Sequence, residues 1–120
     1  MHWAHWSKVK MRAVWSWAGW CHVWRTEGSL HQWCWANAAS AIAVFLVPLT
    51  SGQRATILMG GIFILAIECM NTAIERVVDD ISTETRDRAR QAKDAGSAAV
   101  AVAAIGVGVA WVVALSDIIW

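Results

Sequence analysis

The apolar positions of the chain fall into three long stretches, and the second of them contains acidic residues. The stretch 95–116 carries no charge and is long enough to cross a bilayer as a helix. The stretch 33–49 is at the short end of the spanning range and ends in a polar turn. The uncharged run 55–67 is too short to span, so its helix has to continue through the acidic stretch to about Val78. The pattern predicts three transmembrane helices, over 33–49, 55–78 and 95–118.

Composition supports a membrane protein of the all-α class. The 120 residues are 58% hydrophobic and 16% charged, with a mean hydropathy of +0.43. A soluble chain of this length could not bury so much apolar surface in its own core. We therefore expect a single membrane domain over 1–120. The net charge of +1 gives no indication of nucleic-acid binding.

Tryptophan is concentrated before the first apolar stretch, where eight of the ten tryptophans occur within the first 35 residues. Trp17, Trp20 and Trp24 are spaced to share one face of a helix, and lysine and arginine lie between the aromatic residues. Because tryptophan prefers the headgroup layer, this pattern predicts an amphipathic surface helix over 1–30. The alternative is an unstructured leader. A metal site is disfavoured because no pair has a recognised ligand spacing among His2, His5, Cys21, His22 and His31.

The charged residues between the apolar stretches indicate an orientation. The segment 79–94, which we expect to be a loop with a helix extension, contains Arg86, Arg88, Arg90 and Lys93, whereas the first loop has only Arg54. Positive charge accumulates on the cytoplasmic side of membrane proteins. The N-terminus and the 79–94 segment are therefore predicted to be cytoplasmic, and the C-terminus to lie outside.

The acidic stretch places its polar residues on one side of the predicted middle helix. At about 100° per residue, Glu68, Asn71, Glu75 and Asp79 fall within one narrow wedge. Carboxylates are costly when they face lipid, so the wedge should face other helices or a polar cavity. An assembly of several copies around these acidic faces would satisfy that requirement. The alternative reading is a polar seam that holds helices together and has no chemical role.

The same residues are suited to phosphoryl transfer. Carboxylates at a membrane surface can hold Mg²⁺ while leaving positions for phosphate and water, and a further carboxylate can accept a proton from a hydroxyl. Downstream, Lys93 supplies a point charge for phosphates, followed by Asp94 and Ser97. The chain has neither a P-loop nor a kinase-type glycine-rich loop. Spacing alone therefore leaves both an enzyme and a structural or pore-forming oligomer open.

A family resemblance rests on the run from Glu68 to Val100. The blocks "ECMNTAIERVVDDIS" and "AKDAGSAAV" resemble the signature of the small prokaryotic diacylglycerol kinases, E-x-x-N-[ST]-A-I-E-x-V-V-D followed by A-K-D-x-G-S-A-A-V. Like residues also occur upstream, at Ser16, Gly19, Trp24, Glu27 and Gln32. The resemblance implies an integral protein of the bacterial cytoplasmic (inner) membrane that transfers the γ-phosphate of ATP to diacylglycerol, giving phosphatidic acid. It also implies Mg²⁺ dependence and a homotrimer with active sites between protomers.

The resemblance also implies roles for individual residues. Glu68 would be the general base that activates the lipid hydroxyl, and Glu27 and Glu75 would hold the metal of Mg–ATP. The expected nucleotide-binding residues are Lys8, Trp15, Glu27, Glu75, Glu84, Arg86, Lys93 and Asp94. The expected lipid-binding residues are Glu68, Asn71, Ser97 and Trp111.

Departures from the family pattern are concentrated near the N-terminus. Ala18 and Cys21 stand where basic residues are frequent, and Trp33 stands where many members have a second glutamate. Trp15 replaces a usual tyrosine, and Lys8 replaces an arginine. These substitutions affect expected contacts of the surface helix, whereas the block from Glu68 onward is intact.

Two alternatives to a diacylglycerol kinase are distinguished by the second block. Undecaprenol kinases of the same fold family usually read A-K-D-x-A-A-G-A-V, whereas Gly96 and Ser97 here follow the diacylglycerol-kinase order. A hydroxyl at Ser97 could bond to a polar glycerol ester, which favours diacylglycerol over an isoprenoid alcohol. A non-enzymatic membrane oligomer would need no particular order of Lys93, Asp94 and Ser97, so the sequence favours the enzyme.

Overall fold

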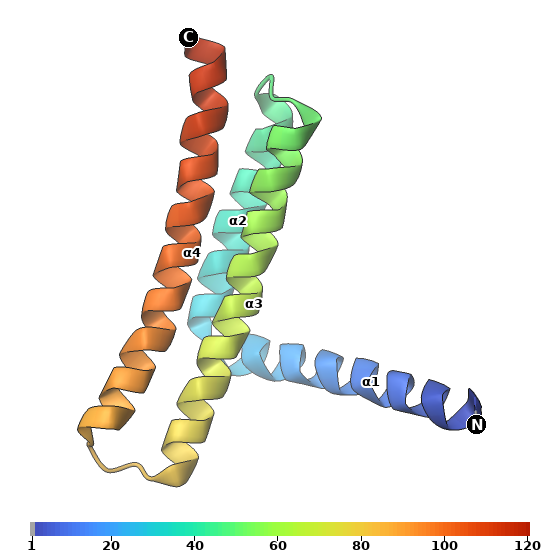
Figure 1. The fold of residues 1–120 in the computed structure, drawn as a ribbon, viewed down its shortest axis with the longest axis vertical. Coiled ribbons are helices and arrows are strands. Elements are labelled where there is room, and N and C mark those ends of the chain that lie inside the picture. The colour runs from blue at the N-terminus through green and yellow to red at the C-terminus, as the bar shows by residue number, and fades with distance from the viewer. Residues whose placement is uncertain (1) are drawn as a thin grey trace.

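The computed structural model describes residues 2–120, with side chains from Ala4 onward, and these residues form four α-helices. Met1, at the start of the predicted surface helix, and the side chains of His2 and Trp3 lie outside the described part. The helices are α1 (His2–Thr26), α2 (Gly28–Leu46), α3 (Ser51–Ile81) and α4 (Asp87–Ile119). The last three run side by side in alternating directions, and α1 projects sideways from one end of them (Figure 1). The prediction of an all-α protein is confirmed.

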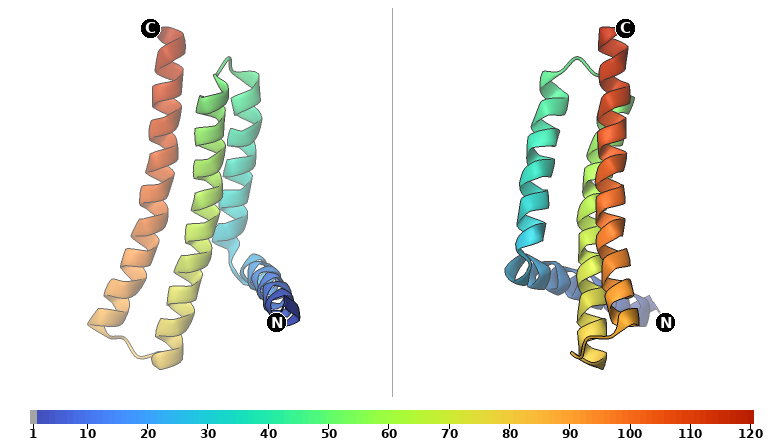
Figure 2. Two further views of the ribbon diagram at one scale, coloured as in Figure 1. Left: turned by 45° about the vertical axis from the view of Figure 1, so that its right-hand side comes forward. Right: turned by 90° about the vertical axis from the view of Figure 1, so that its left-hand side faces the viewer.

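A sharp change of direction separates α1 from α2. Only Glu27 stands between the two helices, with an extended backbone (φ −118°, ψ 107°). The Trp24 ring stacks on Trp20 and on His31, with ring centroids 6.4 and 3.9 Å apart. A ring nitrogen of His31 also lies 2.6 Å from the Trp24 carbonyl oxygen. The contacts between Trp24 and His31 cross the junction, where α1 leaves the bundle at a steep angle (Figure 2).

The turn between α2 and α3 is fixed by side-chain hydrogen bonds. The Thr50 hydroxyl accepts from the Gln53 amide at 3.2 Å, while the Gln53 side chain accepts from the Thr50 amide at 3.0 Å, forming a capping box. Arg54 donates to the carbonyl oxygens of Val44 and Val47 at 2.7 and 3.3 Å. Pro48 has no N–H to donate to the Val44 carbonyl oxygen, so Arg54 satisfies an acceptor that the end of α2 leaves free.

α3 is the central helix, since it contacts each of the other three. Small residues allow close approach to both neighbours: a Cβ added to Gly60 would lie 2.9 Å from Val107 on α4, and one added to Gly61 would lie 2.6 Å from the Asn37 side chain on α2. The buried apolar cluster gathers near the α2–α3 turn and consists of Val44, Leu49, Ile57 and Ala114. The buried polar residues Glu68, Asn71 and Thr72 lie farther along α3, away from this turn.

The outer surfaces of the bundle are apolar. α3 and α4, of 31 and 33 residues, are long and apolar enough to cross a membrane, and α2 is outside this group. Only 11% of the most apolar part of α4 is buried within the protomer. Large side chains such as Phe45, Ile62, Val102 and Val112 are exposed. In water such a large exposed apolar surface would promote aggregation, so we expect lipid or other copies of the protein to cover it.

Helix bounds differ from the sequence expectation chiefly around the second connection. α3 extends to Ile81 and α4 begins at Asp87, so residues 82–86 alone separate them. Most of the 79–94 segment is therefore helical and prolongs α3 and α4 beyond their apolar parts. This extension places Arg88, Arg90 and Lys93 on the first turns of α4, at the end of the bundle nearer the α1–α2 junction (Figure 1).

Candidate active site

The acidic face of α3 passes from buried to exposed along the helix. Glu68 is only 4% exposed and Asn71 only 9%, whereas Glu75 is half-buried and Asp79 is exposed. A buried carboxylate needs hydrogen-bond partners. Glu68 has one from α2, because the Ser29 hydroxyl donates to Glu68 Oε1 at 2.6 Å. The acidic face is thus enclosed by neighbouring helices at Glu68 and opens toward the end of α3.

Asn71 occupies the contact between α3 and α4. Its Nδ2 lies 3.5 Å from Glu75 Oε1, a long hydrogen bond, and its Oδ1 is buried without a hydrogen-bond partner among the described residues. The same Oδ1 lies so close to Gly96 that a Cβ on that residue would overlap it. The middle of the second sequence block therefore meets the beginning of the first block, because glycine leaves room for the amide.

The α1–α2 junction is tied to α3 by an ion pair. Arg76 Nη2 donates to Glu27 Oε1 at 2.9 Å and to the Thr26 hydroxyl at 3.2 Å. The Glu27 side chain does not cap α2, so its carboxylate is directed to α3 instead. This bond brings the expected metal-binding Glu27 to the residue that follows Glu75 in sequence.

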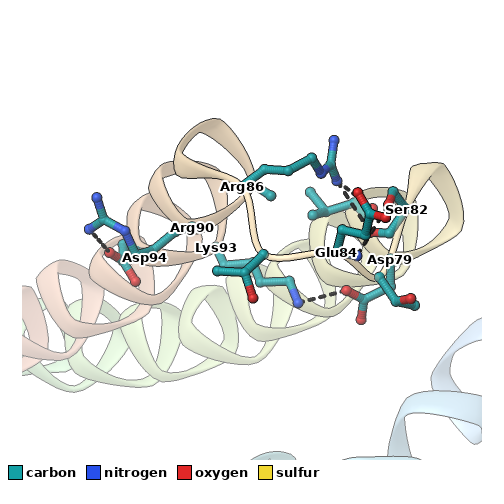
Figure 3. Close-up of a pocket in the computed structure, with 11 residues that line it drawn as sticks. Asp79, Ser82, Glu84, Arg86, Arg90, Lys93 and Asp94 are labelled. Atoms are coloured by element: carbon teal, nitrogen blue, oxygen red, sulfur yellow. Dashed lines mark hydrogen bonds and ion pairs between the residues drawn. The ribbon is translucent and has the colours of Figure 1, made fainter.

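A pocket of about 260 Å³ lies where α3, the 82–86 segment and α4 meet (Figure 3). In its lining, Lys93 Nζ forms an ion pair of 2.6 Å with Asp79 Oδ1, and Arg90 pairs with Asp94 at 3.6 Å. Arg86 Nη2 donates to the carbonyl oxygens of Val78 and Ser82. The residues that line this pocket include four of the predicted nucleotide-binding residues, namely Glu84, Arg86, Lys93 and Asp94.

The other predicted site residues lie farther from these groups. Lys8 and Trp15 are on the exposed surface of α1, and in the described part of the chain no hydrogen bond or ion pair joins either side chain to the acidic face. Ser97 is exposed on α4 near Gly96. Trp111 lies much farther along α4, where its Nε1 donates to the Ser40 hydroxyl at 2.9 Å and links α4 to α2.

Sequence reasoning did not include Ser29 or Arg76 in the site. Ser29 follows Glu27 by two positions, and nothing in the local pattern indicates its contact with a residue 39 positions away. A weak indication that Arg76 belongs to the site was present in the sequence, because it is a cation directly beside Glu75 in a largely apolar segment. Asp79 was recognised as part of the acidic wedge, but its pairing with Lys93 was not.

The carboxylates of Glu27 and Glu75 are suited to bind a metal ion that is also bound by phosphate groups. Among the residues with described side chains, no group of three or more His, Cys, Asp or Glu side chains could hold a metal by itself. Mg²⁺ commonly needs only one or two carboxylates, with phosphate and water completing its shell. Glu75 and Glu27, which is bound to Arg76, provide carboxylates of this kind, so the donor chemistry fits Mg²⁺ bound together with a nucleotide.

The fold and the site define a small helical membrane protein in which α3 carries a buried carboxylate at Glu68 and, farther along, one wall of a charged pocket. Comparison with known proteins places it more closely. The profile of the family described as prokaryotic diacylglycerol kinase matches residues 14–115. The chain therefore belongs to the prokaryotic diacylglycerol kinase family, and the predicted lipid-kinase class is confirmed.

Individual relatives cover most of the chain. A diacylglycerol kinase of Pseudomonas aeruginosa is 34% identical over 94 residues, which are 78% of this chain and 76% of the relative. The diacylglycerol kinase of Escherichia coli K12 is 28% identical over 109 residues, 91% of this chain and 89% of the relative. An undecaprenol kinase of Bacillus subtilis is 40% identical over 83 residues, 68% of this chain and 66% of the relative.

Proposed function

We propose that the protein phosphorylates diacylglycerol, with ATP as phosphate donor and Mg²⁺ as the metal. The observation that carries the proposal is the burial of Glu68 against α2, on the same helix that forms one wall of the charged pocket. A base for a lipid hydroxyl has to lie within the membrane-facing bundle, whereas a nucleotide has to reach the site from water. The acidic face of α3 connects these two environments.

In the proposed reaction, the lipid hydroxyl oxygen attacks the γ-phosphorus of ATP and the bond to the β-phosphate oxygen breaks, releasing ADP. Glu68 accepts the hydroxyl proton. Glu27 and Glu75 would hold Mg²⁺, which neutralises phosphate charge. Lys93, Asp94, Glu84 and Arg86 would contact the nucleotide from the pocket, and Lys8 and Trp15 would reach it from α1. Asn71, Ser97 and Trp111 are the remaining proposed lipid contacts.

We further propose three membrane crossings, by α2, α3 and α4, with α1 at the cytoplasmic surface of the inner membrane. The alternating directions of α2, α3 and α4 and the basic residues of 86–93 support this arrangement. A homotrimer with sites between protomers is part of the proposal. The large apolar side chains that one protomer leaves exposed on α3 and α4 are available for contact with other copies as well as with lipid.

Undecaprenol is the second candidate substrate, since an undecaprenol kinase is among the relatives. The hydroxyl of Ser97 favours diacylglycerol, because it can bond to a glycerol ester. A single hydrogen bond of this kind contributes about 1 kcal/mol, which is roughly fivefold in affinity.

The test is a competition assay with purified protein, γ-labelled ATP and Mg²⁺, in detergent micelles that contain diacylglycerol and undecaprenol at equal mole fraction. We expect label to enter diacylglycerol preferentially. Preferential labelling of undecaprenol would reassign the substrate, and absence of transfer to either alcohol would contradict the kinase proposal. The Glu68→Gln variant, prepared in the same way, measures the background.

A further inference from the structure

Ser29 and Glu68 form the shortest polar contact between α2 and the acidic face of α3. The hydroxyl oxygen of Ser29 lies 2.6 Å from Glu68 Oε1 and donates the hydrogen bond. This distance is in the range of charge-assisted O–H···O⁻ bonds, which are about 2.5–2.7 Å long. Glu68 itself is 4% exposed, so water cannot easily replace the hydroxyl.

The position of Ser29 is determined by its neighbours. Leu30, the next residue, is fully buried, and Val23 at the end of α1 is also buried. On the other side, Glu27 is bound to Arg76 of α3. The first turn of α2 is therefore anchored on both sides of Ser29, and the hydroxyl is held against α3 by more than its own hydrogen bond.

The hydrogen bond distinguishes the two oxygens of the Glu68 carboxylate. Oε1 accepts from Ser29, whereas no described side chain donates to Oε2, so Oε2 is the freer oxygen to receive a proton. A carboxylate held at one oxygen also has less freedom to rotate, and a base is effective only when it lies within hydrogen-bond reach of the proton that it removes. Small errors in such positioning reduce turnover more than they reduce binding.

We propose that Ser29 is a positioning residue for Glu68, which holds Oε1 so that Oε2 faces the hydroxyl of the lipid substrate. The proposal rests on the function proposed above, in which Glu68 is the general base. Ser29 does not touch the reacting atoms and acts through the carboxylate alone.

Replacement of the hydroxyl tests the proposal directly. Ser29→Ala should lower kcat about tenfold, as expected for loss of one hydrogen bond to a charged group. The KM values for lipid alcohol and for ATP should change less than about twofold, because neither substrate contacts Ser29. Ser29→Thr retains the hydroxyl and should restore most of kcat. Equal kcat for Ser29→Ala and the unchanged protein would overturn the proposal, as would failure of threonine to restore activity.

Asn37→Ala provides a matched control for helix docking. Asn37 lies on α2 and donates to the Gly61 carbonyl oxygen of α3 at 3.1 Å, so it joins the same two helices away from Glu68. Its loss should lower the thermal midpoint of the protein in micelles about as much as Ser29→Ala does, with kcat changed less than about twofold. A tenfold fall in kcat for both variants would assign Ser29 a merely structural role and overturn the proposal.

Variants of Glu68 distinguish the positioning role of Ser29 from the proposed role of Glu68 as general base. In Glu68→Asp the shorter side chain cannot reach Ser29 in the same way, so Ser29→Ala should cause little further loss there. A full tenfold further loss would overturn the positioning role. If Glu68→Gln kept near-normal activity, the base assignment itself would be wrong, whereas an inactive Glu68→Gln with a fully active Ser29→Ala would contradict the positioning role alone.

Discussion

Arg76 and Glu27 join the α1–α2 junction to α3 through a hydrogen bond of 2.9 Å between guanidinium and carboxylate. The guanidinium of Arg76 thus occupies the Glu27 carboxylate, which we propose as a metal ligand. Arg76 and Mg²⁺ would therefore compete for the same oxygen, and binding of the metal would release the guanidinium. The pair is partly exposed, with 47% of the Arg76 side chain and 22% of the Glu27 side chain accessible.

Arg76→Gln should lower the Mg²⁺ concentration needed for half-maximal activity. Exposed ion pairs contribute about 0.2–1 kcal/mol, so the expected decrease is at most about fivefold. Titration of activity with Mg²⁺ at fixed ATP measures it, and binding of Mn²⁺ followed by electron paramagnetic resonance gives a readout independent of turnover. An increased Mg²⁺ requirement would contradict competition and would indicate that Arg76 holds Glu27 in its binding position.

The two glutamates of the acidic face should differ in the kind of defect that their substitution causes. Glu68→Gln should reduce kcat by orders of magnitude while leaving assembly intact, because a base is lost and the side-chain volume is kept. Glu75→Gln should instead raise the Mg²⁺ requirement, because a metal ligand is lost. Steady-state kinetics over a range of Mg²⁺ concentrations distinguishes them, with size-exclusion chromatography as the control for assembly. Full rescue of Glu68→Gln by added Mg²⁺ would exclude the base role.

Gly96→Ala should separate α3 from α4 near the site. The added methyl group would overlap Asn71 Oδ1, so we expect a loss of about 1–3 kcal/mol in the free energy of unfolding and a marked fall in activity. Gly106→Ala on the same helix is the control, because nothing in the protomer lies within 4 Å of a Cβ there. Denaturation in micelles, followed by near-ultraviolet circular dichroism, provides the comparison. Equal stability of the two variants would contradict the close contact at Gly96.

The proposed topology predicts opposite labelling of the two ends of α4. Single cysteines introduced at Thr83 and at Ile119, in a background without Cys21, Cys34 and Cys69, can be probed with a membrane-impermeant maleimide. In intact cells whose outer membrane has been permeabilised, we expect position 119 to react and position 83 to react only after the inner membrane is disrupted. The reverse pattern would contradict the topology and the access of cytoplasmic ATP to the pocket.

Helical periodicity was sufficient to place the polar residues of α3 on one face. Three- and four-residue spacing determines which residues share a helix face, whatever packs against it. Glu68 and Asn71 on that face are buried, as the cost of exposing them to lipid led us to expect. Composition was likewise sufficient for the all-α class. The exact ends of the helices could not be predicted from the sequence. Residues 79–81 have no apolar pattern of their own, and they are helical because the hydrogen bonding of α3 continues through them.

The partners of the acidic residues could not be derived in the same way. Ser29 meets Glu68 across 39 positions of sequence, and Arg76 meets Glu27 across 49. Such contacts depend on the angle at the α1–α2 junction and on the depth at which α2 lies along α3. Those quantities follow from the whole set of packed side chains, including the stack of Trp24 on His31, rather than from any local spacing.

The hydrogen bonds of Arg86 have a consequence for ligand entropy. Arg86 binds the Val78 and Ser82 carbonyl oxygens, and the Ser82 hydroxyl accepts from the Glu84 amide, so the short connection 82–86 is already ordered. Fixing the backbone of one residue costs about 1–2 kcal/mol in conformational entropy. For these five residues that loss accompanies folding, and a nucleotide entering the pocket would encounter a preorganised rim. Its binding free energy would then reflect its contacts with the pocket, with little deducted for immobilising the loop.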